Sequence, residues 1–255
     1  SLQKLALLAE IIGAVAVADV PYRTGSGFLP VAESTQVQVE TQTPAGNAIV
    51  IDATFAMDFN TDYTVVAADS IAAPVAIVIT NPSDEPIFPG NFRAQVVHAA
   101  AGAPDVDVYV TAFDAPLASS VPVNAAPLAF EGSTGRVEVP EGDYQIRVTL
   151  AGDPDSIVYD SGEITLAADA DLLIAAVVNT GPGDRPIELI VLDGTGSARL
   201  LDTATPSTVF AVHASPDAGD VDILADDTAT EADDGIALAN GVGFAAACTI
   251  ETVPA

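Results

Sequence analysis

Apolar and polar residues alternate along several short segments of the chain, which is typical of β-strands that bury one face. Turn-forming clusters such as AGAPD, PEGD, NTGPGD and LDGTG separate these segments. No segment combines a sustained helical period with capping residues, and even LALLAEIIGAVAV near the start is predicted mainly as strand. About seven strands in about 110 residues predict an all-β fold of tandem immunoglobulin-like β-sandwiches. The clearest strands are VDVYV (106–110), RVEV (136–139), YQIRVTL (144–150) and IELIVL (187–192).

The same phrases recur along the chain, which indicates an internal repeat. VHAAAGAPDVDVYV (97–110) returns as VHASPDAGDVDI (212–223). GRVEVPEGDYQIRV (135–148) has one counterpart in GFLPVAESTQVQV (27–39) and another in TIETVPA (249–255). The spacing between these matches gives a repeating unit of about 110 residues.

Three copies of this unit account for the chain. The first, 1–90, is a β-sandwich repeat that lacks the VHA strand at its start; the second, 91–206, is complete; the third, 207–255, stops in its first half. A sandwich with missing strands exposes apolar surface and unpaired backbone. Two explanations follow. Either the sequence is an excerpt of a longer chain, or the terminal VHA strand of one subunit completes the first copy of the next, a head-to-tail contact that yields a filament.

The charge balance excludes one class of partner. The chain carries 36 acidic and 7 basic residues, a net charge of −29, and Lys4 is the only lysine. Because phosphate binding requires clusters of Lys and Arg, we expect no nucleic-acid partner. No apolar stretch reaches the length of a transmembrane helix, so we also expect no membrane insertion. Hydrophobic residues make up 49% of the chain, which is enough for packed cores beneath an acidic exterior suited to saline surroundings.

Both histidines of the chain fall in the repeated VHA phrase. An aspartate follows nine residues later in each copy, which associates His98 with Asp107 and His213 with Asp222. If the two strands of the phrase form a hairpin, histidine and aspartate face each other across it in a pair worth about 0.2–1 kcal/mol. If the strands lie in different sheets, the imidazole bonds instead to the loop backbone. Either arrangement makes these residues structural.

Two chemical roles compete with the structural one at these histidines. Metal ligation is disfavoured because one histidine and one carboxylate per copy are too few for a closed zinc site. General acid–base catalysis is disfavoured because the phrase has no neighbouring nucleophile and no recognisable oxyanion hole. We therefore predict no catalytic residues and a protein that is not an enzyme.

Calcium is the one cofactor that the composition suggests. The segment 217–234 carries eight carboxylates, and hard cations prefer oxygen ligands. No stretch matches an EF-hand loop or the glycine-rich calcium repeat, so we expect a solvated loop and no cofactor. The weak candidates for calcium ligands are Asp217, Asp220, Asp226 and Asp227.

Cysteine and tyrosine are two further residue types that can form sites. Cys248 is the single cysteine, so no intrachain disulfide is possible, and its apolar context predicts a buried, inert thiol. Tyrosines could form a carbohydrate-binding stripe, but without any Trp we expect them to pack in the core or beside strands. The tyrosines in question are Tyr22, Tyr109, Tyr144 and Tyr159.

The phrase VHASPDAGDVDI, the VPEG turn before YQIRVT and the IELIVLD strand together resemble a bacterial family of domains of unknown function numbered forty-three ninety-seven. The resemblance covers nearly the whole chain, although the second copy has AAGAPD where the third has ASPDAGD and the first lacks the phrase. It implies tandem β-sandwich domains in exported or surface-attached bacterial proteins. It carries no catalytic or ligand residues over to this chain.

From these observations we expect a structural or adhesive module of an extracellular or cell-surface protein, acting as a spacer, stalk or filament unit. Its expected partners are other copies of itself or neighbouring repeats. The alternative from another functional class is an extracellular module that binds a small ligand or a polysaccharide with the loops at one end of a sandwich.

Overall fold

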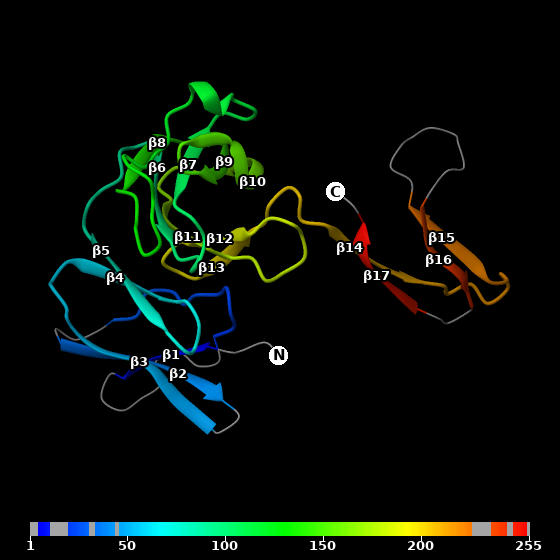
Figure 1. The fold of residues 1–255 in the computed structure, drawn as a ribbon, viewed down its shortest axis with the longest axis horizontal. Helices are drawn as coiled ribbons and strands as arrows, with labels where there is room; N and C mark the ends of the chain where they lie inside the picture. Colours follow the sequence, from blue (N-terminus) through cyan, green and yellow to red (C-terminus); the bar gives the residue numbers. More distant parts are fainter. Residues whose placement is uncertain are drawn as a thin grey trace. The chain divides into compact units, whose positions relative to one another are not determined.

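The computed structural model shows a chain built almost entirely of strands (Figure 1). The described residues hold seventeen strands and one short 3-10 helix, which confirms the predicted all-β class. No helix among them is long and apolar enough to cross a membrane. Contacts divide the chain into two units, Ser1–Thr180 with Arg185–Asp202 and Gly181–Asp184 with Thr203–Ala255. The structure describes residues 5–10, 20–30, 34–43, 46–225, 236–243 and 247–253.

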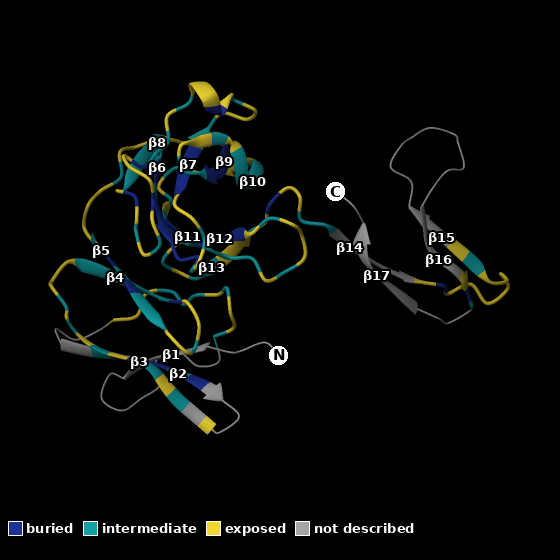
Figure 2. Ribbon diagram, viewed as in Figure 1, coloured by how far each residue is buried: buried dark blue, intermediate teal, exposed yellow. Residues whose placement is uncertain are grey.

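The middle of the chain forms a two-layer β-sandwich within the first unit. One layer is a three-stranded sheet in the order β10-β9-β7, and the other is a five-stranded sheet in the order β13-β12-β11-β6-β8. Their facing sides share one apolar core that includes the fully buried Val148 and Leu189, and Figure 2 shows buried stretches in β6, β7, β9 and β11. The elements are β6 (Asn91–His98), β7 (Val106–Thr111), η1 (Leu117–Ser119), β8 (Val137–Pro140), β9 (Gly142–Leu150), β10 (Asp153–Leu166), β11 (Asp171–Val178), β12 (Ile187–Leu192) and β13 (Ser197–Leu200).

β6 and β11 form the one parallel pair among the described strands. The register runs from Arg93 opposite Asp171 to His98 opposite Ala176. A parallel pair needs a long crossover connection, and here the chain passes through β8 and the whole three-stranded sheet between the two strands. This crossover ties the two layers of the sandwich together.

The outer face of the five-stranded sheet is covered by a hairpin from earlier in the chain. In this hairpin, β4 (Thr61–Ala68) pairs antiparallel with β5 (Val75–Pro82). Buried residues of both layers form a second apolar core, which comprises Ala68, Ile77 and Ile79 of the hairpin and Val97, Ala99, Leu173, Ala175 and Ile190 of the sheet. The five-stranded sheet is therefore buried on both faces, and this region has three layers.

The start of the first unit forms a separate antiparallel sheet in the order β1-β2-β3. Val37 and Val39 are buried and alternate with half-buried neighbours, as the alternation in QVQVE predicts. The strand predicted near the start of the chain is confirmed over Leu5–Glu10, whereas 11–19 lie outside the described residues. The three strands are β1 (Leu5–Glu10), β2 (Ser34–Thr43) and β3 (Gly46–Ala56).

The second unit contains two antiparallel strand pairs, β14 with β17 and β15 with β16. The first pair repeats the pairing of β6 with β8, because Ser207 lies opposite Val253 as Phe92 lies opposite Val139. The repeat in the sequence is therefore also a repeat of strand pairing. The strands are β14 (Ser207–Val212), β15 (Val221–Ala225), β16 (Ile236–Val242) and β17 (Ala247–Val253).

Replacing Leu189 with Ala is expected to lower the free energy of unfolding by about 2–5 kcal/mol, because the side chain is fully buried between the two sheets and its loss leaves a cavity. Chemical denaturation followed by circular dichroism measures this. The matched control is Val121→Ala at a position that is 83% exposed, where a change below about 0.5 kcal/mol is expected. Equal losses at both positions would contradict the assigned core.

Candidate functional site

His98 closes the loop that follows β6. Its Nε2 lies 3.1 Å from the carbonyl oxygen of Pro104, and its Nδ1 accepts a hydrogen bond of 3.3 Å from the backbone N–H of Ala100. Because Nδ1 accepts from the main chain, Nε2 is the ring nitrogen that donates to the carbonyl of Pro104. The imidazole is 1% exposed and packs edge-on against Phe130, with 6.2 Å between ring centroids. Both ring nitrogens therefore serve to shape the loop.

His213 repeats this arrangement after β14. Its Nε2 lies 3.0 Å from the carbonyl oxygen of Gly219, and its Nδ1 accepts from the backbone N–H of Ser215 at 3.4 Å. In both copies the partners lie two and six residues after the histidine. The repeated VHA phrase therefore encodes a repeated loop that a buried histidine closes.

The aspartates of the phrase hold other parts of the chain. The Oδ1 of Asp107 accepts from the Nδ2 of Asn124 at 2.9 Å, and its Oδ2 accepts from the backbone N–H of Gly152 at 2.8 Å. The Oδ1 of Asp222 accepts from the backbone N–H of Gly241 at 2.8 Å. The two strands of the phrase lie in different sheets in both copies. The hairpin that would set each histidine opposite its aspartate therefore does not form, and the bond to the loop backbone is the arrangement observed.

Asn124 is a structural residue that the sequence reasoning missed. Its Oδ1 accepts from the backbone N–H of Val108 at 2.8 Å, while its Nδ2 donates to Asp107 and to the carbonyl of Ala126. It thereby pins the connection after η1 to the edge of β7. The available signal was Asn240, which stands at the matching place in the third copy.

The candidate calcium ligands are not brought together in the described part of the chain. Asp217 accepts a hydrogen bond of 3.0 Å from the hydroxyl of Ser215, and Asp220 is exposed. Asp226 and Asp227 lie outside the described residues. Among the residues that the structure describes, no group of three or more His, Cys, Asp or Glu side chains could hold a metal ion.

The tyrosines considered for a carbohydrate stripe lie in separate environments. Tyr109 and Tyr159 are buried, and the hydroxyl of Tyr159 donates to the carbonyl of Leu200 at 3.1 Å. Burial raises the pKa of the Tyr159 hydroxyl strongly. Tyr144 donates to the carbonyl of Pro140. Two of the four rings are thus inside the core, where no sugar can reach them.

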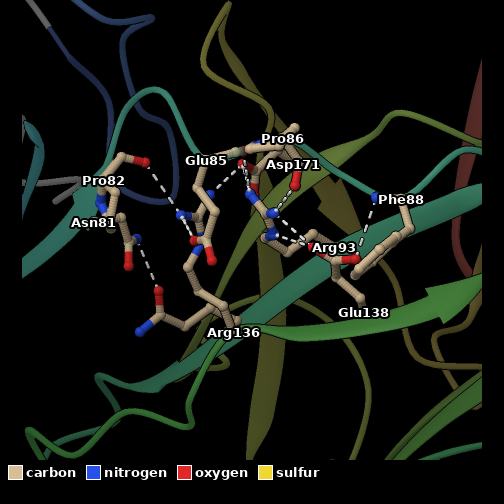
Figure 3. Close-up of polar contacts among 10 residues, drawn as sticks. Asn81, Pro82, Glu85, Pro86, Phe88, Arg93, Arg136, Glu138 and Asp171 are labelled. Atoms are coloured by element: carbon tan, nitrogen blue, oxygen red, sulfur yellow. Dashed lines mark hydrogen bonds and ion pairs between the residues drawn. The ribbon is translucent and has the colours of Figure 1, made fainter. Parts of the chain in front are cut away.

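Arg93 of β6 is the centre of a polar cluster at the start of the second repeat (Figure 3). Its side chain is 2% exposed and makes five hydrogen bonds, which matches the five N–H donors of a guanidinium. Two acceptors are the main-chain carbonyls of Glu85 and Pro86, at 3.0 and 2.7 Å, in the linker between β5 and β6. The others are Oε1 of Glu138 on β8 and Oδ2 of Asp171 on β11. The guanidinium therefore fixes the linker to both strands that flank β6.

The charges of this cluster stabilise one another. The hydrogen bond from Arg93 lowers the pKa of Glu138 below its usual value. Burial by itself would lower the pKa of Arg93, but Glu138 and Asp171 outweigh burial and the pKa is raised. Arg136 extends the cluster, since its Nη1 lies 2.9 Å from a carboxylate oxygen of Glu85 and its Nη2 donates to Asp171.

Arginine pairing was also missed from the sequence. Five of the six arginines form ion pairs: Arg23 and Arg199 with Glu188, Arg93 with Glu138 and Asp171, Arg136 with Glu85 and Asp171, and Arg185 with Asp202. The sixth, Arg147, is buried and donates to the hydroxyl of Thr111 and the carbonyl of Ala115. The signal in the sequence was the small number of basic residues. With 7 basic and 36 acidic residues, each arginine has many carboxylates with which it can pair.

A cavity of about 650 Å³ lies between the hairpin, the outer face of the five-stranded sheet and the segment 20–29. This segment is held against the turn after β12 by a hydrogen bond of 2.8 Å from the N–H of Phe28 to the carbonyl of Gly194. Gly194 has a φ of 79°, and a Cβ there would meet the Phe28 ring at 2.9 Å, so the close approach needs glycine. The apolar part of the lining includes Val66, Leu173, Ala175, Val177, Ile190 and Leu192.

The polar wall of the cavity carries both signs of charge. Burial raises the pKa of Tyr22, and the nearby charge of Glu188 adds to the effect. Burial also raises the pKa of Asp62, while Arg136 opposes the shift. Hydrogen bonds from its own turn lower the pKa of Asp193. The cavity thus combines an apolar floor with polar edges.

Sheets that pack on a shared apolar core, together with a histidine-closed loop in the second and third copies, define a tandem β-sandwich repeat protein. The family model of the domain of unknown function DUF4397 matches residues 8–109 and again residues 114–224. The chain therefore belongs to this family, which confirms the resemblance found in its sequence. A comparison with curated proteins found none that matches the chain.

Replacing His98 with Phe is expected to lower the free energy of unfolding by about 1–3 kcal/mol. The ring shape is roughly kept, but the buried N–H of Ala100 and the carbonyl of Pro104 lose their partners. Urea denaturation measures the loss. His98→Asn, which keeps a donor and an acceptor, should recover part of it, and an unchanged stability of His98→Phe would exclude the loop-closing role.

Replacing Glu138 with Gln is expected to destabilise the protein at neutral pH but not in acid. Because the pKa of Glu138 is lower in the folded state, the unfolded state binds more protons between the two pKa values. The stabilising contribution is therefore present above the unfolded value, near 4.5, and is lost as the pH falls through the folded value. Urea denaturation at about pH 7 and about pH 3 measures the difference from wild type.

The matched control for this pH dependence is Glu163→Gln, which changes an exposed glutamate of β10. Its difference from wild type should stay small at both pH values. A wild-type advantage over Glu138→Gln that grows as the pH falls would contradict the assigned ion pair.

Proposed function

We propose that the chain is a non-enzymatic structural or adhesive module of an exported bacterial surface protein, and that copies of it assemble head to tail. The observation that carries this proposal is the apolar core shared by the β4–β5 hairpin and the outer face of the five-stranded sheet. The hairpin precedes the second repeat in the sequence, so this core joins one repeat to the next. Repeat proteins whose neighbours share such cores form extended scaffolds.

The joint between repeats has the features of a rigid connection. Val97 of the sheet is fully buried, and Ile77 and Ile79 of the hairpin are nearly so. Arg93 holds the linker through two main-chain carbonyls and is itself bound by carboxylates of β8 and β11. A buried apolar contact together with a fixed linker keeps two repeats in one orientation, which a spacer or stalk requires.

The use of the polar groups supports a role without catalysis. Both ring nitrogens of His98 are engaged with the loop backbone, so the imidazole is not free to act as a base. Asp107 is engaged with Asn124 and Gly152. These side chains maintain the shape of loops at the end of the sandwich.

The charge distribution supports a surface location in saline surroundings. The chain has a net charge of −29, and five of its six arginines are paired with carboxylates. These positive charges are thus neutralised by neighbouring carboxylates, and the exterior stays acidic. Such an exterior keeps an exported protein soluble and repels nucleic acid.

A second candidate function is the binding of a small ligand or polysaccharide outside the cell. The cavity of about 650 Å³ favours it, since ligand sites are typically about 300–1,000 Å³ with apolar walls and a few polar groups. Tyr22 and Asp62 at its wall could position a hydroxyl-rich ligand. Reproducible hits on a glycan array by a monomeric chain would support this function instead of assembly.

Concentration-dependent self-association is the expected outcome for the first function. Sedimentation velocity should show oligomers that grow with protein concentration, and electron microscopy should show thin linear assemblies. Added salt should strengthen the association, because it screens repulsion between acidic chains. A chain that stays monomeric at every concentration and salt level would overturn the assembly part of the proposal.

A further inference from the structure

One edge of β4 has no partner strand in the described structure. β4 pairs only with β5, whereas its counterpart in the sandwich, β11, pairs with β12 on one side and β6 on the other. The β4–β5 hairpin corresponds to the β11–β12 hairpin. In the first, Ala68 pairs with Val75, which follows Pro74. In the second, Val178 pairs with Ile187, which follows Pro186. An unpaired edge presents a row of N–H and C=O groups that can template another strand.

The cavity of about 650 Å³ runs along this same edge. Every residue from Thr61 to Ala67 lines it, on both faces of the strand. Consecutive residues of a strand point to opposite faces, so all of them reach one cavity only if it opens along the strand edge. Its floor is the apolar outer face of the sheet, including Leu173 and Ala175. The cavity therefore lies beside β4 in the position that β6 occupies beside β11 in the sandwich.

A strand that fits this space occurs in the third copy. β14 corresponds to β6, because it carries the same VHA phrase, pairs with β17 as β6 pairs with β8, and ends in the same histidine-closed loop. Its second edge has no partner among the described strands. Val212 is 56% exposed, whereas its counterpart Val97 is fully buried. Val212 thus lacks the cover that Val97 has in the sandwich.

We propose that β14 of a second copy adds to β4 along the cavity, parallel to it and in the register that β6 takes on β11. This inference rests on the proposed self-assembly and names the contact that produces it. The register follows from the sandwich, where Val96 lies opposite Ile174. The equivalent positions set Ala211 of one chain opposite Thr64 of the next.

Growth by this contact has no natural end. Acceptor and donor are different surfaces, so each chain that accepts a strand at β4 still offers its own β14. Main-chain hydrogen bonds supply affinity, and side chains that enter the cavity supply specificity.

Cross-linking tests the register directly. Two chains are prepared in a Cys248→Ser background, one tagged and carrying Thr64→Cys, the other untagged and carrying Ala211→Cys. After mixing and treatment with a short bismaleimide, we expect a covalent heterodimer whose linked peptides contain positions 64 and 211. The matched control replaces Ala211→Cys with Val212→Cys, which faces the other side of the sheet and should link several-fold less.

Competition and chain topology complete the test. A synthetic peptide of residues 207–213 in excess should suppress the heterodimer, whereas the same peptide in scrambled order should not. Equal linking of both cysteine pairs, or no linking in samples that sediment as oligomers, would overturn the strand proposal while the proposed function stands. A chain that carries both Thr64→Cys and Ala211→Cys and forms only cross-links within one molecule would also overturn it. A chain that is monomeric throughout would overturn both.

Discussion

The five-stranded sheet is apolar on both faces, and this property sets the architecture around it. Along β11 one set of alternating residues faces the sandwich core and the other set faces the hairpin. A sheet of this kind is stable only when both faces are covered, as in sheets whose parallel strands are buried on two sides. The three-stranded sheet covers one face and the β4–β5 hairpin covers the other. The alternating sets are Leu172, Ile174 and Ala176, and Leu173, Ala175 and Val177.

Local features of the fold could be predicted from the sequence because they depend on neighbours along the chain. Alternation predicted strands such as β2 and β7, and turn residues predicted where they end. The repeated phrase pointed to structural histidines, because its short loop holds the partners of both ring nitrogens of His98 within six residues. The choice between a His–Asp hairpin and a bond from the histidine to the loop backbone depends on the sheet to which each strand belongs. Sheet membership is not a local property of the sequence.

Long-range features could not be predicted in this way. Arg93 binds Glu138 and Asp171, which lie 45 and 78 residues away, and no periodicity links these positions. The parallel pair of β6 and β11 is equally remote, since most of the sandwich lies between the two strands. A hint was present in LLIAAVV, whose unbroken apolar run is typical of a strand buried on both faces rather than on one.

The boundaries of the two family matches differ from the boundaries of the sandwich. The first match ends at residue 109, within β7, and the second begins at residue 114. The sandwich therefore takes β6 and most of β7 from one match and β8 to β13 from the other. A gene fragment cut between the matches would separate β6 from β11 and encode neither half of the sandwich as a closed fold.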